Sequence, residues 1–208
     1  MDKDAAIRII TACAKLYDDN LKNKNLLFFF DDGWNGVAYI ETLFLRRNYL
    51  HLTGVIQSGT RMRATDFYDI SLRGQLSPSH FDLHKDGSSD LKLSVLSTIM
   101  SIHKTAKMVG DYNMTKSLLI TEKIVGTVTA CLGFVRENDY YLPNTVLRED
   151  IRDVTRSPQR RILATSLKKS NDTVYSEISY LAKDFTIGSL VLPDEIKKKV
   201  KIQETAKP

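Results

Sequence analysis

The stretch TEKIVGTVTACLGFVREND, residues 121–139, decides the fold. Its first part, Thr121–Thr129, alternates in polarity and is rich in β-branched residues, which is typical of a β-strand. Cys131–Val135 is a second dense apolar run, and Glu137–Asp139 is a turn of the kind that closes hairpins. Strands that follow one another through so short a turn pair in antiparallel fashion. The stretch therefore predicts an antiparallel sheet.

Further strand signals lie on both sides of this stretch. Tyr140–Leu142 begins a third strand, and we expect Pro143 to break it because proline cannot donate to a ladder. Arg161–Lys168 alternates and predicts a fourth strand. Upstream, the apolar run Leu26–Phe30 and the segment Val37–Phe44 flank a turn rich in Asp, Gly and Asn, which predicts a hairpin.

Apolar residues at helical spacing predict helices in other parts of the chain. The predicted helices are Asp4–Asp18, a short one at Ala64–Arg73, a long one at Leu91–Asp111, one turn within Arg148–Asp153, and a last one from Asn171 or Thr173 to Lys183. Cys13 lies on the apolar stripe of the first helix, so we interpret it as a core residue rather than a nucleophile.

The order of these elements predicts an α+β fold, an antiparallel sheet with helices packed on one face. We divide the chain into an N-terminal helix (residues 1–24), a main α+β domain (25–185) and a basic C-terminal tail (186–208). No glycine-rich phosphate loop, HExxH or GxSxG motif occurs in the sequence, so the major enzyme classes that depend on them have no support.

Composition is that of an ordinary globular protein, with 42% hydrophobic and 26% charged residues among 208. Thirty Lys and Arg against 25 Asp and Glu give a net charge of +5, of which +4 falls in residues 145–208. This excess permits an anionic partner such as nucleic acid, although a lysine-rich tail can also serve solubility alone. Two cysteines are too few for a disulfide framework, and residues 1–20 show no secretory signal. We therefore expect a cytoplasmic protein with no membrane segment.

Three short segments combine groups suited to phosphodiester chemistry. They are HLTG (residues 51–54), TEK (121–123) and YYLPNT (140–145), the last followed by several arginines. Metal-independent RNA cleavage needs one group to deprotonate the 2′-hydroxyl, one to protonate the leaving oxygen, and cations around the phosphorane-like transition state. Histidine, lysine, arginine, threonine and tyrosine supply all of these, so we expect neither a metal nor a cofactor.

Each of these segments also has a structural interpretation. His51 can cap a turn or bond within the core, and Lys123 can protect a strand edge from aggregation. Asn144 and Thr145 after a proline can simply form a turn. A stretch at residues 82–87 has some calcium-loop character, but position twelve of that loop is Leu93 instead of glutamate, so we interpret it as a polar turn.

The motifs NYLHLTGV (48–55), TEKIVG (121–126) and YYLPNTVLREDIR (140–152) together resemble the phage-associated Barnase–EndoU–Colicin–RelE nuclease families, and best the fourth of these groups. The similarity extends from about Leu26 to Lys183 and includes LSTIMSIHKTAKMVGDYN (96–113). It implies N-terminal helices packed on a four-stranded antiparallel sheet. It also implies metal-independent RNA cleavage in conflicts involving phages, prophages or other mobile elements.

The resemblance and the chemistry together assign expected roles. We expect His51 to transfer a proton, Lys123 to stabilise phosphate charge in the same pocket, and Thr145 to complete the catalytic set. The residues expected to bind substrate are Thr53, Asn144, Arg148 and Arg161, the last on chemical grounds alone. The segment from Arg148 to Arg161 should lie beside the pocket of His51.

The resulting hypothesis is an RNA-cleaving toxin or effector with RNA as its partner and an antitoxin or immunity protein as a second partner. A non-catalytic module that binds protein or nucleic acid on a nuclease-like fold, such as a phage counter-defence factor, is the alternative.

Overall fold

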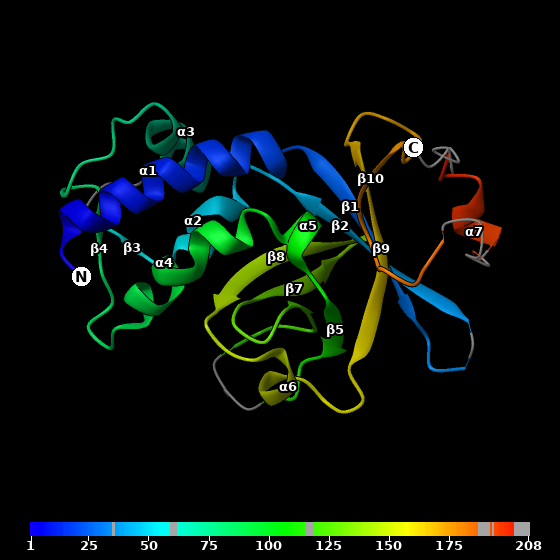
Figure 1. The fold of residues 1–208 in the computed structure, drawn as a ribbon. Coiled ribbons are helices and arrows are strands. Elements are labelled where there is room, and N and C mark those ends of the chain that lie inside the picture. Colours follow the sequence, from blue (N-terminus) through cyan, green and yellow to red (C-terminus); the bar gives the residue numbers. More distant parts are fainter. Residues whose placement is uncertain (35, 59–61, 115–118, 187–191, 193, 202–208) are drawn as a thin grey trace.

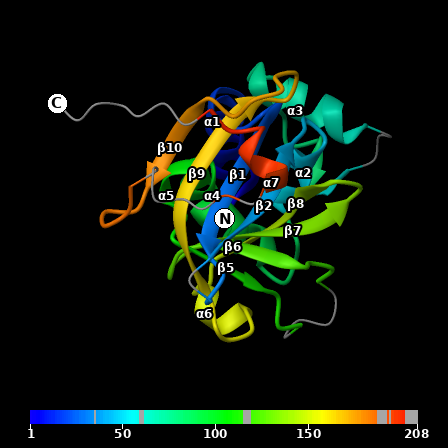
Figure 2. The same cartoon turned by 90° about the vertical axis from the view of Figure 1, so that its right-hand side faces the viewer.

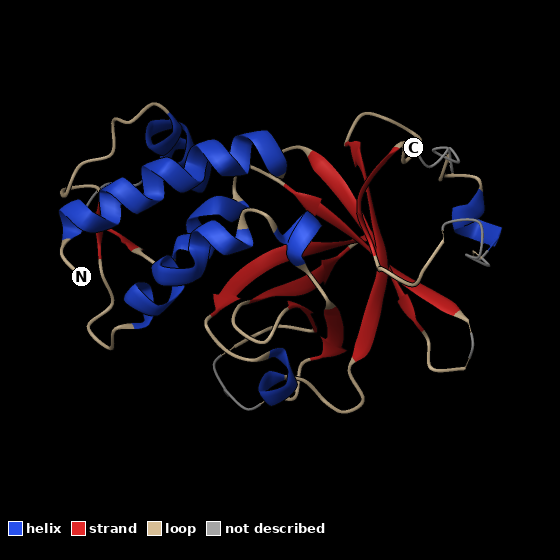
Figure 3. Ribbon diagram, in the orientation of Figure 1, coloured by secondary structure: helices blue, strands red, loops and turns tan. Residues whose placement is uncertain are grey.

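The computed structural model describes residues 1–34, 36–58, 62–114, 119–186, 192 and 194–201. The fold is α+β, with a helical part and a large, mostly antiparallel sheet (Figures 1 and 3). The helical part consists of α1 (Lys3–Asn20), α2 (Asn48–Thr53), α3 (Ala64–Leu72) and α4 (Ser88–Ile99), and it includes the small pair β3 (Ile56–Gln57) and β4 (Phe81–Asp82).

Helix α1 confirms the first predicted helix and shows how it is anchored. The Asp2 side chain accepts a hydrogen bond from the backbone N–H of Ala5 at 2.6 Å, which caps the helix start. The buried face includes Cys13, which is 2% exposed, and Tyr17, which is fully buried. Both belong to the same hydrophobic core as Phe28 of the sheet. Helix α1 therefore shares one hydrophobic core with residues 25–185, which the sequence analysis treated as a separate domain.

Eight strands of the described residues form one sheet, in the order β1-β2-β8-β7-β6-β5-β9-β10. Their bounds are β1 (Lys24–Asp31), β2 (Val37–Phe44), β5 (Met108–Asp111), β6 (Lys123–Gly126), β7 (Cys131–Glu137), β8 (Tyr140–Leu147), β9 (Arg160–Lys169) and β10 (Glu177–Leu181). Strand β1 also pairs with β9, so the succession of pairings closes on itself. The sheet thus has twice the four strands that the resemblance implied, and the predicted β1–β2 hairpin is confirmed.

The predicted long helix Leu91–Asp111 is wrong in its second half. Helix α4 ends at Ile99, one turn forms α5 (Ile102–Thr105), and the chain then becomes strand β5. The helical spacing of apolar residues continues through this region, but Val109 and Gly110 belong to β5. This strand pairs with β6 on one edge and with β9 on the other. Pairing on both edges outweighs the local helical pattern.

The C-terminal part also differs from the predictions. Residues 177–181, expected in a helix, form β10 instead. This strand pairs in antiparallel fashion with β9, where its partners include Ser166 and Thr165. Pro143 does not end β8, because the register skips Asn144 there, and such a bulge tolerates a missing N–H. The predicted helical turn exists as α6 (Ile151–Val154), and a short helix, α7 (Asp194–Lys197), follows.

Three hydrophobic clusters hold these elements together. The largest lies between the helices and the sheet and includes the aromatic group of Tyr17, Tyr49 and Tyr68, whose ring centroids lie 5.2 to 5.8 Å apart. A smaller cluster joins Ile196 of α7 to Phe29 of β1, which places α7 against the sheet (Figure 2). No helix among the described residues is long and apolar enough to cross a membrane.

Candidate nucleic-acid cleft

A cleft opens where the two halves of the sheet part. Strand β2 pairs with β8 at a single position, Thr42 with Tyr141, and residues 37–41 of β2 border a hollow of about 660 Å³. A second hollow of about 230 Å³ lies between β5 and the α6–β9 loop. Phe30 and Lys123 line both hollows, so we treat the two as one cleft, with a large part and a small part.

Lys123 occupies the junction of the two parts. It is the first residue of β6, paired across the strands with Asp111 of β5. Its ammonium nitrogen lies 2.5 Å from Asp111 Oδ1, and the lysine side chain is 27% exposed. The ion pair therefore holds Lys123 at a defined place while the group stays accessible from the cleft.

The small part receives Arg156 from the α6–β9 loop and Arg160 from the start of β9. The backbone N–H of Arg156 donates to the carbonyl of Asp111 at 2.8 Å, which fixes this loop against β5. The contact needs Gly110, because a Cβ there would lie 2.7 Å from Cβ of Thr155. Arg160, four residues further on, lines the same hollow.

The charges of the two parts differ. Lysine and arginine balance aspartate and glutamate in the large part, which is lined by Lys123, Arg136, Lys199, Glu41, Asp139 and Glu195. Of the described residues that line the small part, three are cations, Lys123, Arg156 and Arg160, and one is a carboxylate, Asp111. The small part is therefore the better place for a phosphate group.

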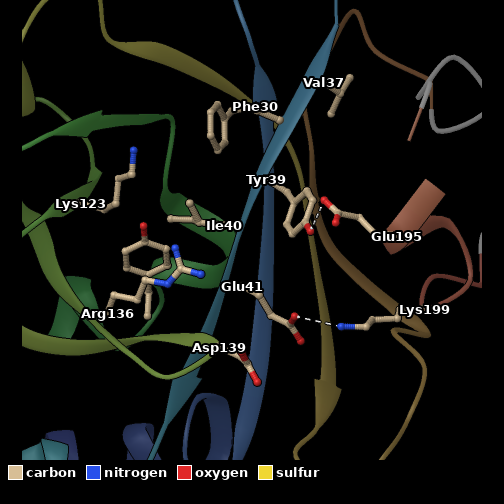
Figure 4. Close-up of a pocket in the computed structure, with 12 residues that line it drawn as sticks. Phe30, Val37, Tyr39, Ile40, Glu41, Lys123, Arg136, Asp139, Glu195 and Lys199 are labelled. Carbon is tan, nitrogen blue, oxygen red and sulfur yellow. Dashed lines mark hydrogen bonds and ion pairs between the residues drawn. The ribbon is translucent and has the colours of Figure 1, made fainter. Parts of the chain in front are cut away.

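One wall of the large part is built by the C-terminal segment (Figure 4). Tyr39 donates a hydrogen bond to Glu195 at 2.8 Å, and Lys199 lies 3.6 Å from Glu41. Burial, and then Glu195, raise the pKa of Tyr39 to about 12, so its hydroxyl stays protonated. Lys123 and Arg136 lie on the other side of the β2 ribbon in this view.

Comparison with protein families gives a match over residues 9–184 to the family described as phage-Barnase-EndoU-ColicinE5/D-RelE like nuclease4. The chain belongs to this family. The match includes the whole small part of the cleft and ends before Glu195 and Lys199. Searches of curated proteins and of solved structures give no match.

Membership of this nuclease family confirms the resemblance seen in the motifs, but the structure does not gather the expected site residues in one pocket. His51 is exposed on α2 in the helical part and does not line the cleft of Lys123. Thr53, two residues on, is fully buried, and its hydroxyl donates to the carbonyl of Leu50 at 2.7 Å. A side chain so enclosed has no access to a substrate, so the expected contact of Thr53 with RNA is corrected.

The three expected residues of the β8 region lie outside the Lys123 cleft as well. Asn144 bonds to Thr121 and to the carbonyl of Ile120, which ties down the segment before β6. Thr145 is 2% exposed and, together with Arg148, lines a separate hollow near His84 and Lys92. The Arg148 end of the arginine-rich segment is thus separate from its Arg156–Arg160 end.

Arg161 illustrates the effect of strand alternation. It is exposed and lies 3.8 Å from Asp184, whereas its neighbour Arg160 lines the cleft. Successive side chains of a strand point to opposite faces, and the choice between 160 and 161 depends on which face the cleft uses.

Sequence reasoning missed Asp111 and Arg136 as members of the site. It expected the segment Arg148–Arg161 to contribute to phosphate binding, but it singled out Arg148 and Arg161 rather than Arg156 and Arg160. Asp111 was hidden by its assignment to a helix, since only its place in β5 brings it opposite Lys123. The cluster of arginines after residue 147 was a usable signal, and two of its members do line the cleft. In the described residues, no group of three or more His, Cys, Asp or Glu side chains is arranged to hold a metal ion.

Proposed function

We propose that the protein is a metal-independent endoribonuclease that acts as a toxin or effector in phage conflict. The observation that carries the proposal is the small part of the cleft, where three cations surround space for a phosphate in a chain of a nuclease family. The proposed substrate is RNA, because its 2′-hydroxyl supplies the nucleophile that a metal-independent cleavage needs.

The proposed reaction is attack of the 2′-hydroxyl on the adjacent phosphorus. Asp111 takes the hydroxyl proton, the P–O2′ bond forms, the P–O5′ bond breaks, and water protonates the departing 5′-oxygen. Lys123, Arg156 and Arg160 stabilise the charge that develops on the phosphate oxygens. The products are a 2′,3′-cyclic phosphate and a 5′-hydroxyl.

Asp111 replaces His51 as the proton acceptor in this scheme. A catalytic base must lie within hydrogen-bond reach of the proton that it removes. Asp111 lines the small part and contacts Lys123, whereas His51 does not line the cleft. Only the residue that accepts the 2′-hydroxyl proton differs from the sequence-based expectation. The proposal keeps Lys123 as the residue that stabilises phosphate charge.

Cleavage of a labelled single-stranded RNA in EDTA tests this function. We expect Lys123→Ala and Asp111→Asn each to lower the rate by roughly 10²–10⁴-fold, the usual effect of a positioned catalytic group. Lys104→Ala is the matched control, because Lys104 is exposed on α5 and does not line the cleft. A rate unaffected by Lys123→Ala would remove the cleft from the chemistry. The toxin role predicts that the wild type arrests bacterial growth on expression and that Lys123→Ala does not.

The second candidate is a non-catalytic RNA-binding module. It is favoured by the observation that none of the four histidines, at positions 51, 80, 84 and 103, lines the cleft. The side chain that most readily gives and takes protons near neutral pH is therefore missing from this site. The same assay decides, because tight binding of the labelled RNA without cleavage at any pH from 5 to 9 supports the module.

A further inference from the structure

The turn between β1 and β2 exposes a large aromatic side chain. Trp34 is the one tryptophan of the sequence, and it is 86% exposed. The hairpin that carries it projects at the end of the sheet away from α1 (Figure 1). Exposing an indole ring to water gives up the free energy that its burial would supply, about 25 cal/mol per Å².

The backbone on both sides of Trp34 is held by the two aspartates of the turn. Asp32 Oδ1 accepts hydrogen bonds from the N–H groups of Trp34 at 2.7 Å and Gly36 at 2.9 Å. Asp31 Oδ1 accepts from the N–H of Gly33 at 2.6 Å. The bonds from the N–H groups of Trp34 and Gly36, and then the charge of Arg160, lower the pKa of Asp32. The backbone N–H of Trp34 is therefore already anchored to Asp32, which lowers the cost of ordering when the ring binds.

The same turn touches the basic part of the cleft. The guanidinium of Arg160 lies directly on Gly33, where a Cβ would come within 1.9 Å of its Nη1. Gly33 also has a φ of +83°, a conformation that residues with a Cβ rarely adopt. Glycine therefore suits this position both in backbone conformation and in the space left beside Arg160. Trp34 thus follows immediately after a residue in contact with Arg160, which lines the small part with Lys123.

We propose that Trp34 is a stacking site for an unpaired nucleobase of the strand whose phosphate occupies the small part of the cleft. Aromatic side chains beside a basic groove bind single strands because every base offers a flat π-face, and each such stack contributes about 1–3 kcal/mol. A duplex hides these faces between its base pairs. The inference rests on the proposed RNA binding and restricts it to single-stranded RNA.

Because Trp34 is the sole tryptophan, its fluorescence reports on the site directly. The probe is a 2′-O-methyl RNA oligonucleotide, which lacks the free 2′-hydroxyl and so stays uncleaved in the proposed reaction. We expect the single strand to quench the emission on binding and the duplex of the same sequence to leave it unchanged. Binding of the single strand without any change in emission would overturn the stacking site.

Affinity measurements with the same labelled probe separate the inference from the function. Trp34→Ala should weaken single-strand binding about 5- to 150-fold, the equivalent of one stack, while Trp34→Phe retains most of the affinity. Ile120→Ala is the control, since that side chain is 82% exposed and outside the cleft. Unchanged affinity of Trp34→Ala refutes the stacking site and leaves the nuclease proposal standing. A wild type that binds no RNA refutes both.

Discussion

Replacing Arg160 and Arg161 one at a time tests which face of β9 binds RNA. The two residues are adjacent and chemically identical, but Arg160 lines the cleft and Arg161 lies near Asp184 on the other side. Each phosphate that a cation neutralises on a single strand contributes about −0.7 to the slope of log K against log salt concentration. Of the five described cations that line the cleft we assign one phosphate each to Lys123, Arg136, Arg156 and Arg160, and none to Lys199, which lies 3.6 Å from Glu41. These four contacts predict a slope of about −2.8 for the wild type.

The slope translates into a measurable loss of affinity. Between 50 and 200 mM salt the wild type should lose about 50-fold in affinity for the uncleavable single strand. Arg160→Ala should lose only about 20-fold over the same range, because its slope falls to about −2.1. Arg161→Ala should match the wild type. Fluorescence anisotropy of the labelled strand at five salt concentrations gives all three slopes.

The opposite pattern would refute the assignment of the cleft. A reduced slope for Arg161→Ala with an unchanged slope for Arg160→Ala would mean that RNA binds the outer face of β9, as the sequence alone suggested. A wild-type slope near zero would mean that no phosphate is neutralised anywhere on the protein.

Three further predictions concern the fold that supports the cleft. Burial, and then the charge of Lys104, lower the pKa of His103 to about 4 in the folded protein. The unfolded state therefore binds more protons than the folded state between pH 6.5 and 4. As a result, the free energy of unfolding should fall by about 2 kcal/mol from pH 8 to pH 5. Urea titrations should show that His103→Gln loses this part of the pH dependence. Gly110→Ala should cost about 1–3 kcal/mol through its clash with Thr155, and Thr155→Gly should restore much of the loss in the same titration. Tyr49→Phe should lower the thermal midpoint and cost about 1 kcal/mol, since the buried hydroxyl then no longer donates to the carbonyl of Ile10.

Local patterns predicted those elements whose apolar spacing matches the structure that they adopt. The β1–β2 hairpin, α1 and β7 followed from apolar periodicity and turn residues, because in these segments the local pattern agrees with the partners that the fold supplies. Two strands whose local spacing is helical were missed. Strand β5 continues the helical spacing of α4, and Val174, before β10, stands at helical intervals from Ile178 and Leu181 within it, yet both strands pair with β9.

The candidate site was predictable only in part for the same reason. Lys123 was found because it starts a clear strand beside a family motif. Asp111 could not be found, since a residue placed in a helix has no cross-strand partner. His51 and Thr53 lie in a motif of the resemblance, but a motif does not reveal that α2 belongs to the helical part and buries Thr53.

The most direct test of the central claim uses a strand with a single ribonucleotide. The cut site is first mapped on an all-ribose RNA in EDTA, and a 2′-O-methyl strand is then made with one ribonucleotide at that site. We expect one cut after that nucleotide, with a 2′,3′-cyclic phosphate and a 5′-hydroxyl identified by mass spectrometry, and no cut by Lys123→Ala. Cleavage of the fully 2′-O-methylated strand, or products with 5′-phosphates formed only after a divalent cation is added, would contradict it.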